Sequence, residues 1–204
     1  MTPFTQLQTI GCPLPVANID TDQLIPARFM SRSRKDGYGD YLLHAQRFAE
    51  DGTPRADFPL NDPKFAGAQV LVALRNFGSG SSREAAVYAL ADYGFRCVIA
   101  PSFGDIFAAN SVNNGVLPAR VSDADARMLI DLLAEHPSIQ IDLETQRITV
   151  GNHVVDFTID PVWRMKLLNG WDDLDLTASY AADIAAFQTR DAKARPWVST
   201  EGGD

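Results

Sequence analysis

The chain has 204 residues, of which 46% are hydrophobic and 22% charged, and its formal net charge is −8. This composition is typical of a soluble globular protein, and the acidic balance disfavours nucleic-acid binding. No apolar run approaches the roughly 18 residues of a membrane-spanning helix. The N-terminal MTPFTQLQTIG has neither the basic start nor the apolar core of a signal peptide, so we expect a cytoplasmic protein.

The first 67 residues predict little regular structure. Residues 1–30 have the pattern of short strands and turns, and residues 31–67 are polar and rich in Gly, Pro and Asp. Within this second stretch only YLLHAQRF (41–48) predicts a short helix. Because long irregular excursions often form lids or binding loops, we expect 31–67 to serve as one.

A strand–helix–strand unit is predicted in the middle of the chain. The apolar run QVLVALR (69–75) suits a buried strand, and RCVIA (96–100) suits the next one. Between them we expect a helix that begins at Ser82 and stops at Gly94. The two strands are expected to be parallel, with a right-handed connection.

The second half of the chain predicts alternating helices and strands. Expected in order are a helix at 103–115, a short strand at 116–121, a helix at 122–136, a hairpin at 138–159 and helices from Pro161 onward. We therefore divide the chain into a main domain at 1–160 and a helical C-terminal extension at 161–204. The last residues, STEGGD (199–204), are expected to be disordered.

The stretch NFGSGSSREAA (76–86) carries the strongest functional signal. Its Ser-x-x-Glu pattern fits a capping box, in which Ser81 caps the helix and the glycines make the turn. Alternatively, the helix start binds an anion through its free N–H groups, with Arg83 as a planar cation and the Ser81 and Ser82 hydroxyls beside it. Nucleotide patterns do not fit, because they need Gly at position 83 or a Lys in the loop. A small carboxylate fits better.

A second polar cluster lies in NIDTDQLIPARF (18–29). Asp20 and Asp22 bracket Thr21, and Arg28 follows shortly after. The pattern fits an Asx-turn followed by a surface arginine. It also fits another carboxylate clamp, in which Asp22 orients a neighbouring polar group.

The cysteines and histidines predict no metal site in this chain. Cys12 and Cys97 are far apart and lack CxxC spacing, and two thiols cannot supply the three or four that an iron–sulfur cluster needs. The histidines, His44, His136 and His153, are scattered. Any metal chemistry would have to come from another chain.

These segments together resemble a known family. NFGSGSSREAAVYALADYGFRCVIAPSFGDIFAANSVNNGVLP (76–118), together with NIDTDQLIPARF (18–29), is similar to the small subunit of 3-isopropylmalate dehydratase, which is related to the swivelling C-terminal domain of aconitase. The resemblance extends over most of residues 5–170. It implies an α/β fold of the aconitase-type swivelling domain, with a β/β/α barrel-like core of mixed sheet and a helical C-terminal extension. Residues 1–160 would then be the catalytic domain.

The resemblance also implies roles for individual residues. Ser81 matches the catalytic base that removes a proton from carbon, and Asp22 matches an active-site aspartate. Arg83 matches the arginine that binds a substrate carboxylate, with Ser82 adding a hydrogen bond and Arg28 as a second carboxylate ligand. The implied reaction isomerises 2-isopropylmalate to 3-isopropylmalate by dehydration and rehydration, in leucine biosynthesis. The implied [4Fe-4S] cluster belongs to the large subunit, the partner with which this chain is expected to form a heterodimer.

Three positions depart from the family pattern. Relatives usually have His where this chain has Ala85, and they often have Cys in place of Ser79 and Ser111. These departures leave open a related dehydratase of 2-methylmalate or 2,3-dimethylmalate, and we expect side chains of 28–37 to contact the alkyl group. An alternative of a different class is a carboxylate-binding regulatory module, in which Ser81 only caps a helix.

Overall fold

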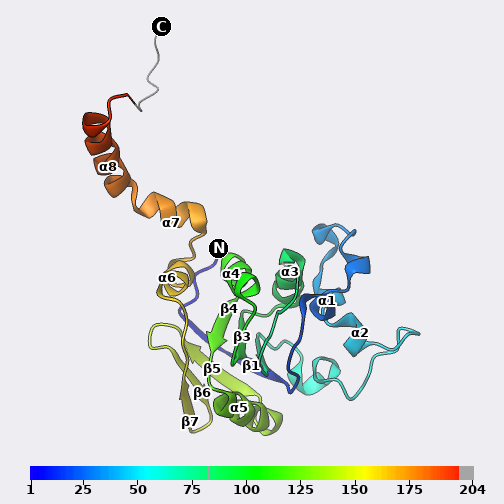
Figure 1. Ribbon diagram of the computed structural model, residues 1–204. Helices are drawn as coiled ribbons and strands as arrows, with labels where there is room; N and C mark the ends of the chain where they lie inside the picture. The colour runs from blue at the N-terminus through cyan, green and yellow to red at the C-terminus, as the bar shows by residue number, and fades with distance from the viewer. Residues whose placement is uncertain (82, 198–204) are drawn as a thin grey trace.

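The computed structural model describes residues 1–81 and 83–197 (Figure 1). Seven strands form one mixed sheet that curls into a half-barrel, in the order β4-β3-β2-β1-β5-β6-β7. This sheet confirms the predicted α/β class and barrel-like core. The strands are β1 (Gln6–Leu14), β2 (Val70–Ala73), β3 (Cys97–Ala100), β4 (Leu117–Arg120), β5 (Ser138–Asp142), β6 (Arg147–Val150) and β7 (His153–Asp156).

The long strand β1 joins the two halves of the sheet. Its first part pairs antiparallel with β5, from Gln6 opposite Asp142 onward. Its last part pairs parallel with β2, from Gly11 opposite Val70 onward. One strand therefore passes from the antiparallel half into the parallel half.

The predicted strand–helix–strand unit is confirmed. Parallel strands β2 and β3 flank α3 (Glu84–Tyr93), which ends at Gly94 in the left-handed conformation that glycine adopts most readily. The helix begins at Glu84 rather than at the expected Ser82, a position outside the described residues. The right-handed connection stays a prediction.

Helices cover both faces of the parallel strands (Figure 1). Along β2, Leu71 and Ala73 pack into the same core as α3, whereas Val70 and Val72 pack into the core beneath α5 (Asp123–Glu135). Burial on both faces explains why this strand is a continuous apolar run instead of an alternating one. The start of α5 is capped as expected, because the Ser122 hydroxyl accepts a hydrogen bond from the backbone N–H of Asp125 at 3.1 Å.

The excursion at 31–67 packs against α3. It consists mainly of single turns, among them α2 (His44–Arg47), which lies within the predicted 41–48 helix. Arg34 forms an ion pair with Asp92 of α3 at 3.1 Å, and the backbone N–H of Tyr38 donates to the same carboxylate at 3.2 Å. The described side chains of the segment thus hold it on the domain, and its role as a lid stays a prediction.

The expected hairpin at 138–159 is a three-stranded meander. A second turn, Gly151–Asn152, reverses the chain so that Val150 of β6 pairs with His153 of β7. Gly151 has a φ of +57°, which suits a two-residue hairpin turn. The prediction of a single hairpin was wrong because a Gly-Asn pair is itself a turn signal.

The outer edge of β4 is covered near its end. Pro118 lies within the strand, and the backbone N–H of Arg120 donates to the carbonyl of Thr158 at 3.0 Å. The N–H of Thr158 donates back to the Arg120 carbonyl at 2.8 Å. This pairing fixes the segment that leads into α6 (Pro161–Asn169).

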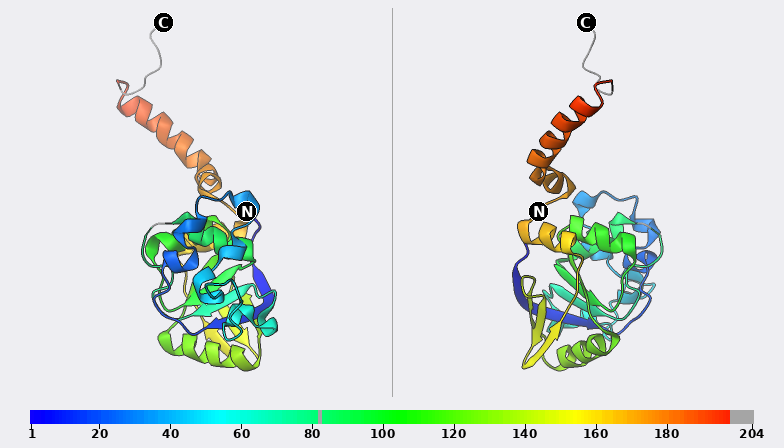
Figure 2. Two further views of the ribbon diagram at one scale, coloured as in Figure 1. Left: turned by 90° about the vertical axis from the view of Figure 1, so that its right-hand side faces the viewer. Right: turned by 60° about the vertical axis from the view of Figure 1, so that its left-hand side comes forward.

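The C-terminal helices differ in how they meet the domain. α6 packs on it through the buried Leu167, whereas α7 (Asp173–Ser179) and α8 (Ala181–Ala194) project away (Figure 2). The projecting part therefore begins after Gly170, and the division at 160/161 remains a proposal. Within the described residues, no helix has the length and apolar character needed to cross a membrane. The predicted disorder at 199–204 lies outside the described residues.

Candidate active site

Two loops meet where the parallel strands end. One (74–83) follows β2, and the other (101–104) connects β3 to α4 (Asp105–Asn113). The N–H of Phe77 donates to the Ser102 carbonyl at 3.0 Å, and the N–H of Gly104 donates to the Phe77 carbonyl at 2.9 Å. In open α/β sheets, ligands bind in the crevice beyond the carboxyl ends of the strands. The fold therefore places NFGSGSSREAA where a ligand site is expected.

Two glycines permit the close contact between these loops. A Cβ at Gly104 would lie 2.5 Å from the Gly78 carbonyl oxygen, and a Cβ at Gly78 would lie 2.2 Å from the Phe107 ring. Gly78 also has a φ of +70°, which side chains disfavour. The two helix starts can therefore approach each other only with glycine at these positions.

A third segment, α1 (Thr21–Leu24), fixes the first loop from the side. The N–H of Thr21 donates to the Ser79 carbonyl, and its hydroxyl donates to the Ser81 carbonyl, both at 2.9 Å. Thr21 is buried, so these bonds are shielded from water. The sequence did not assign Thr21 a role, although it lies between the two aspartates of the second polar cluster.

A cavity of about 200 Å³ lies between the three segments. Its lining residues come from α1 and from the starts of α3 and α4: Thr21, Gly78, Gly80, Ser81, Arg83, Gly104, Asp105, Ile106 and Phe107. Among the described residues, no side chain caps α3 or α4, which leaves first-turn N–H groups for a ligand. The sequence prediction missed the contribution of α4, which the Gly-Asp pair after a strand could have signalled.

The capping interpretation of Ser81 is wrong. Arg83 takes the N-cap position of α3, and no side chain in the described part of the chain caps this helix. Among the described residues, the hydroxyl of the exposed Ser81 has no hydrogen-bond partner. The hydroxyl is therefore not committed to a structural role.

Arg83 and Asp22 lie together, 61 positions apart in sequence. The guanidinium Nη1 of Arg83 forms an ion pair with Oδ1 of Asp22. A carboxylate bound to one part of the guanidinium fork fixes its plane and leaves other N–H donors free for a second anion. The structure thus brings together three of the predicted site residues: Ser81 and Arg83 line one cavity, and Asp22 pairs with Arg83. The fourth, Ser82, lies outside the described residues.

Arg28 is not among the residues that line this cavity. Its guanidinium lies over the Phe29 ring, 4.7 Å from the centroid, and Nη2 is 3.4 Å from Nδ1 of His44. Burial lowers the pKa of His44, and the positive charges of Arg28 and Arg47 lower it further. A neutral imidazole can accept a hydrogen bond from Arg28, so the two side chains are compatible neighbours.

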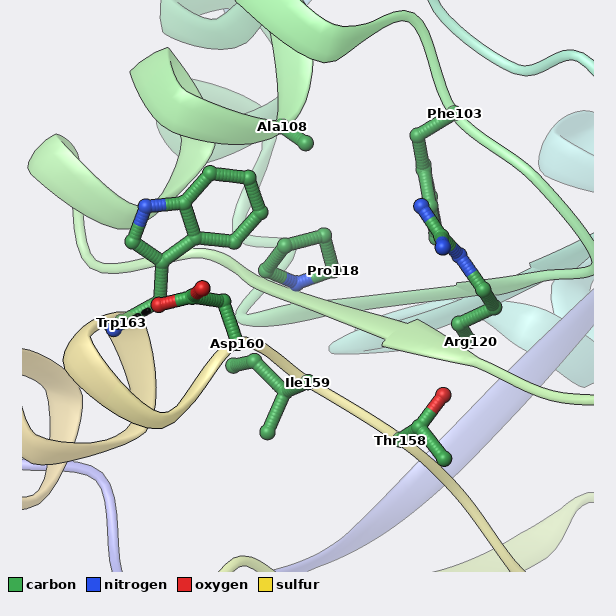
Figure 3. Close-up of a pocket in the computed structure, with 8 residues that line it drawn as sticks. All are labelled: Phe103, Ala108, Pro118, Arg120, Thr158, Ile159, Asp160 and Trp163. Carbon is green, nitrogen blue, oxygen red and sulfur yellow. Dashed lines mark hydrogen bonds between the residues drawn. The ribbon is translucent and has the colours of Figure 1, made fainter.

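A larger cavity of about 400 Å³ is lined in part by Phe103 of the loop between β3 and α4 (Figure 3). Phe103, Pro118, Arg120 and Trp163 help to line it, and the Asp160 carboxylate at its edge caps α6 by accepting from the N–H groups of Val162 and Trp163. The four predicted site residues that the structure describes, Asp22, Arg28, Ser81 and Arg83, do not line this cavity. The smaller cavity is therefore the candidate active site.

The two cysteine thiols do not suit iron–sulfur ligation. Cys12 and Cys97 are both buried in strands. Burial, with a smaller contribution from the Asp62 carboxylate, raises the pKa of Cys12 to about 12, and burial also raises the pKa of Cys97. Cluster ligation requires thiolates, which these sites disfavour. Within the described residues, no three side chains of His, Cys, Asp or Glu are grouped to hold a metal ion.

A family model supplies the deciding comparison. The aconitase C-terminal domain model matches residues 1–124, which contain both loops of the site and α1. This chain belongs to the aconitase C-terminal domain family. The family match thus includes Asp22, Ser81 and Arg83, the three residues that the structure joins.

Individual members of the aconitase family match the chain along nearly its whole length. A 3-isopropylmalate dehydratase small subunit from Afipia carboxidovorans is 44% identical over 201 residues, which are 97% of this chain and 100% of the relative. The one from Oceanobacillus iheyensis is 44% identical over 179 residues, covering 87% and 93%. A crystal structure of 3-isopropylmalate dehydratase from Methanocaldococcus jannaschii superimposes with a TM-score of 0.61 at 23% identity, covering 91% of this chain and 99% of that one. This structural match confirms the aconitase-type fold.

Proposed function

We propose that the chain is the small subunit of a 3-isopropylmalate dehydratase, a hydro-lyase of leucine biosynthesis that acts in the cytoplasm. The observation that carries the proposal is a cavity at the start of two helices that Ser81 and Arg83 both line. The Ser81 hydroxyl has no hydrogen-bond partner among the described residues, and Arg83 pairs with Asp22. The relatives with this name align along 87–97% of the chain, which supports the same assignment.

In the proposed mechanism Ser81 is the base. Its oxygen removes the proton from the carbon next to a substrate carboxylate and later returns it to the neighbouring carbon. A serine hydroxyl is a weak acid, so its anionic form has to be stabilised. The helix starts at the cavity and the Arg83 guanidinium provide positive potential, which exclusion of water would strengthen.

The remaining predicted residues are proposed to bind and orient the dicarboxylate. Arg83 binds one carboxylate, and Asp22 fixes the orientation of the Arg83 guanidinium. The bound carboxylate then places the substrate C–H bond against Ser81. Ser82 would add a hydrogen bond. Arg28 would have to leave His44 to reach the same cavity, so we propose that it binds the second carboxylate only in the assembled enzyme.

The partner is proposed to be a large subunit that carries the [4Fe-4S] cluster. The buried thiols of this chain do not suit cluster ligation, so its own residues act on the proton and the carboxylates. The cluster would supply the Lewis acid for departure of the substrate hydroxyl.

The first prediction concerns the base. In Ser81→Ala, mixed with the large subunit, we expect kcat for 2-isopropylmalate to fall by about 10²–10⁴-fold, because a general base contributes that much. Absorbance of the unsaturated diacid measures the dehydration step, and sedimentation measures assembly, which should be unchanged. The matched control is Ser79→Ala, which removes a hydroxyl from the same loop outside the cavity lining.

Three outcomes would contradict this assignment. Near-normal kcat in Ser81→Ala would remove Ser81 as the base. Dehydratase activity of the small subunit alone would remove the need for a partner. Carboxylate binding without turnover, with and without a large subunit, would favour the regulatory module.

The dehydration assay with 2-methylmalate and 2,3-dimethylmalate in place of 2-isopropylmalate identifies the preferred alkyl group.

A further inference from the structure

The C-terminal arm, defined as residues 173–197, exposes a large apolar surface. Neither α7 nor α8 contains a buried residue. Leu174 is 78% exposed, Phe187 51% and Trp197 77%. In α8, Ile184 and Phe187 follow Tyr180 at positions i+4 and i+7, so the three side chains share one face of the helix. An apolar helical face of this kind usually packs against another surface.

The arm leaves the domain from a fixed root. Lys166 of α6 is 3% exposed, and its ammonium donates to Asn113 and to Asp173, both at 2.5 Å. A buried ammonium is costly unless it is paired, so the first residue of α7 is held to the end of α4. The Asp172 side chain then caps α7 by accepting from the N–H groups of Leu174 and Asp175. The direction in which the arm leaves is therefore set by specific contacts.

Beyond this root, the globular domain does not cover the arm. Both views in Figure 2 show α8 extending away from the sheet and its helices. Among the described residues, no hydrogen bond or ion pair joins residues 174–195 to residues before 170. Helices of 7 and 14 residues are marginal alone in water, so their stability has to come from packing on another molecule.

We propose that the arm docks into an apolar groove of the large subunit that is bordered by basic side chains. This inference rests on the proposed function, which supplies the partner. Asp173 is already paired with Lys166, and between Leu174 and Thr189 the arm contains Asp175, Asp183 and no lysine or arginine. The basic residues Arg190, Lys193 and Arg195 follow only at the far end of the arm, where Arg195 pairs with Asp191. A basic border would therefore complement the part of the arm that lies nearer the domain. A second copy of this chain is a poorer occupant because each copy carries a net charge of −8.

The arm begins at the opposite end of α4 from the candidate active site. The cavity lies at the start of α4, and the arm is rooted at its end, Asn113. The helix has 9 residues, so about 13 Å lies between the two points. A change in the arm should therefore alter the strength of assembly while leaving turnover of the assembled enzyme intact.

The test replaces the apolar face without breaking the helix. In full-length Ile184→Gln/Phe187→Gln, both replacements are good helix formers, and both sites are exposed. We expect the affinity for the large subunit, measured by sedimentation titration, to fall about 10-fold or more, as for truncated interface anchors. The kcat at saturating large subunit should equal that of the wild type. The matched control, Val154→Gln, changes an exposed apolar side chain on β7, away from the arm, and should bind normally.

Several results would overturn the proposal. Wild-type affinity in the double variant would mean that the arm does not dock there. An equal loss in Val154→Gln would mean that the effect is not specific to the arm. Self-association of the small subunit that the double variant abolishes would make a second copy the occupant. Because binding is measured without substrate, subunits that bind but show no turnover would refute the catalytic assignment and leave the docking intact.

Discussion

Thr21 and Asp22 together organise the loop that carries Ser81. Thr21 holds the loop backbone at two carbonyls, and Asp22 holds the Arg83 side chain. Adjacent residues of one short helix thus fix both the base and the carboxylate ligand of the proposed site. We regard Thr21 as a positioning residue, since it acts through the loop.

Removal of the Thr21 hydroxyl tests this role. In Thr21→Val the shape is kept, but the Ser81 carbonyl loses its donor, a bond whose loss costs about 1 kcal/mol of stability. We expect kcat of the assembled enzyme to fall about 10-fold or more with a smaller change in KM, because Ser81 is displaced from the C–H bond. Thr21→Ser should restore most of kcat. If Thr21→Val keeps the wild-type kcat, or if serine fails to restore it, Thr21 has only a structural role.

The family resemblance assigned Asp22 and Arg83 to one site, and their roles there stay predictions. Their ion pair was not predicted, because 61 positions separate the two residues and no local pattern links them. The capping box at Ser81 failed because Thr21 and the glycines hold the loop, and the helix then starts at Glu84. The cation–π contact of Arg28 with Phe29 shows that a cluster in sequence can point to different neighbours.

Among the elements, the meeting of the two loops depends on glycine more than on any side-chain contact. Gly104 approaches the Gly78 carbonyl so closely that even a methyl group would displace one loop. The helix starts of α3 and α4 are brought together by this contact. Their joint cavity is a property of the pair, and neither loop alone would create it.

A methyl group at Gly104 measures this dependence. We expect Gly104→Ala to lower the free energy of unfolding by about 1–3 kcal/mol, the usual cost of overpacking, and to reduce kcat because the cavity is distorted. Urea unfolding and the dehydration assay measure the two effects. The control is Gly52→Ala, which has no atom within 4 Å of the added carbon and bears only the strain of its φ of +83°. Equal stability of the two variants would contradict the steric argument.

Elements with a strong local pattern were predicted well. The runs that form β2 and β3 are apolar throughout, and Ser122 and Gly94 mark helix ends by their own chemistry. The central place of β1 in the sheet was not predictable, because the strands that pair with it lie about 60 and 130 positions away in the sequence. The antiparallel half was underestimated by one strand for a local reason, the overlooked turn at Gly151.

In the whole molecule, the two thiols report on opposite sides of the sheet. Cys12 belongs to the core that contains α3, and Cys97 belongs to the core beneath α5. Because both thiols are buried and have raised pKa values, they can react only when their own core opens. The pair therefore shows whether the half-barrel unfolds as one unit.

Thiol labelling makes this a measurement. At pH 8 without denaturant we expect neither thiol of the folded subunit to react with a disulfide reagent at the rate of a free cysteine, whereas in urea both should react. The variants Cys12→Ser and Cys97→Ser assign each thiol. Labelling of the two thiols at one common rate, tracking global unfolding, is the expected result. Rapid labelling of either thiol in the native protein would show that its core opens separately.

The covered edge of β4 has a consequence for solubility. In this parallel strand the N–H of Leu117 points inward to the Arg96 carbonyl, so the alternate positions, Pro118 and Arg120, face outward. Proline has no N–H, and the Arg120 N–H is already bound to Thr158. The outer side of β4 therefore offers no donor within the strand to an extended peptide, so the sheet cannot grow by strand addition there. Amyloid-like stacking would have to begin at β7.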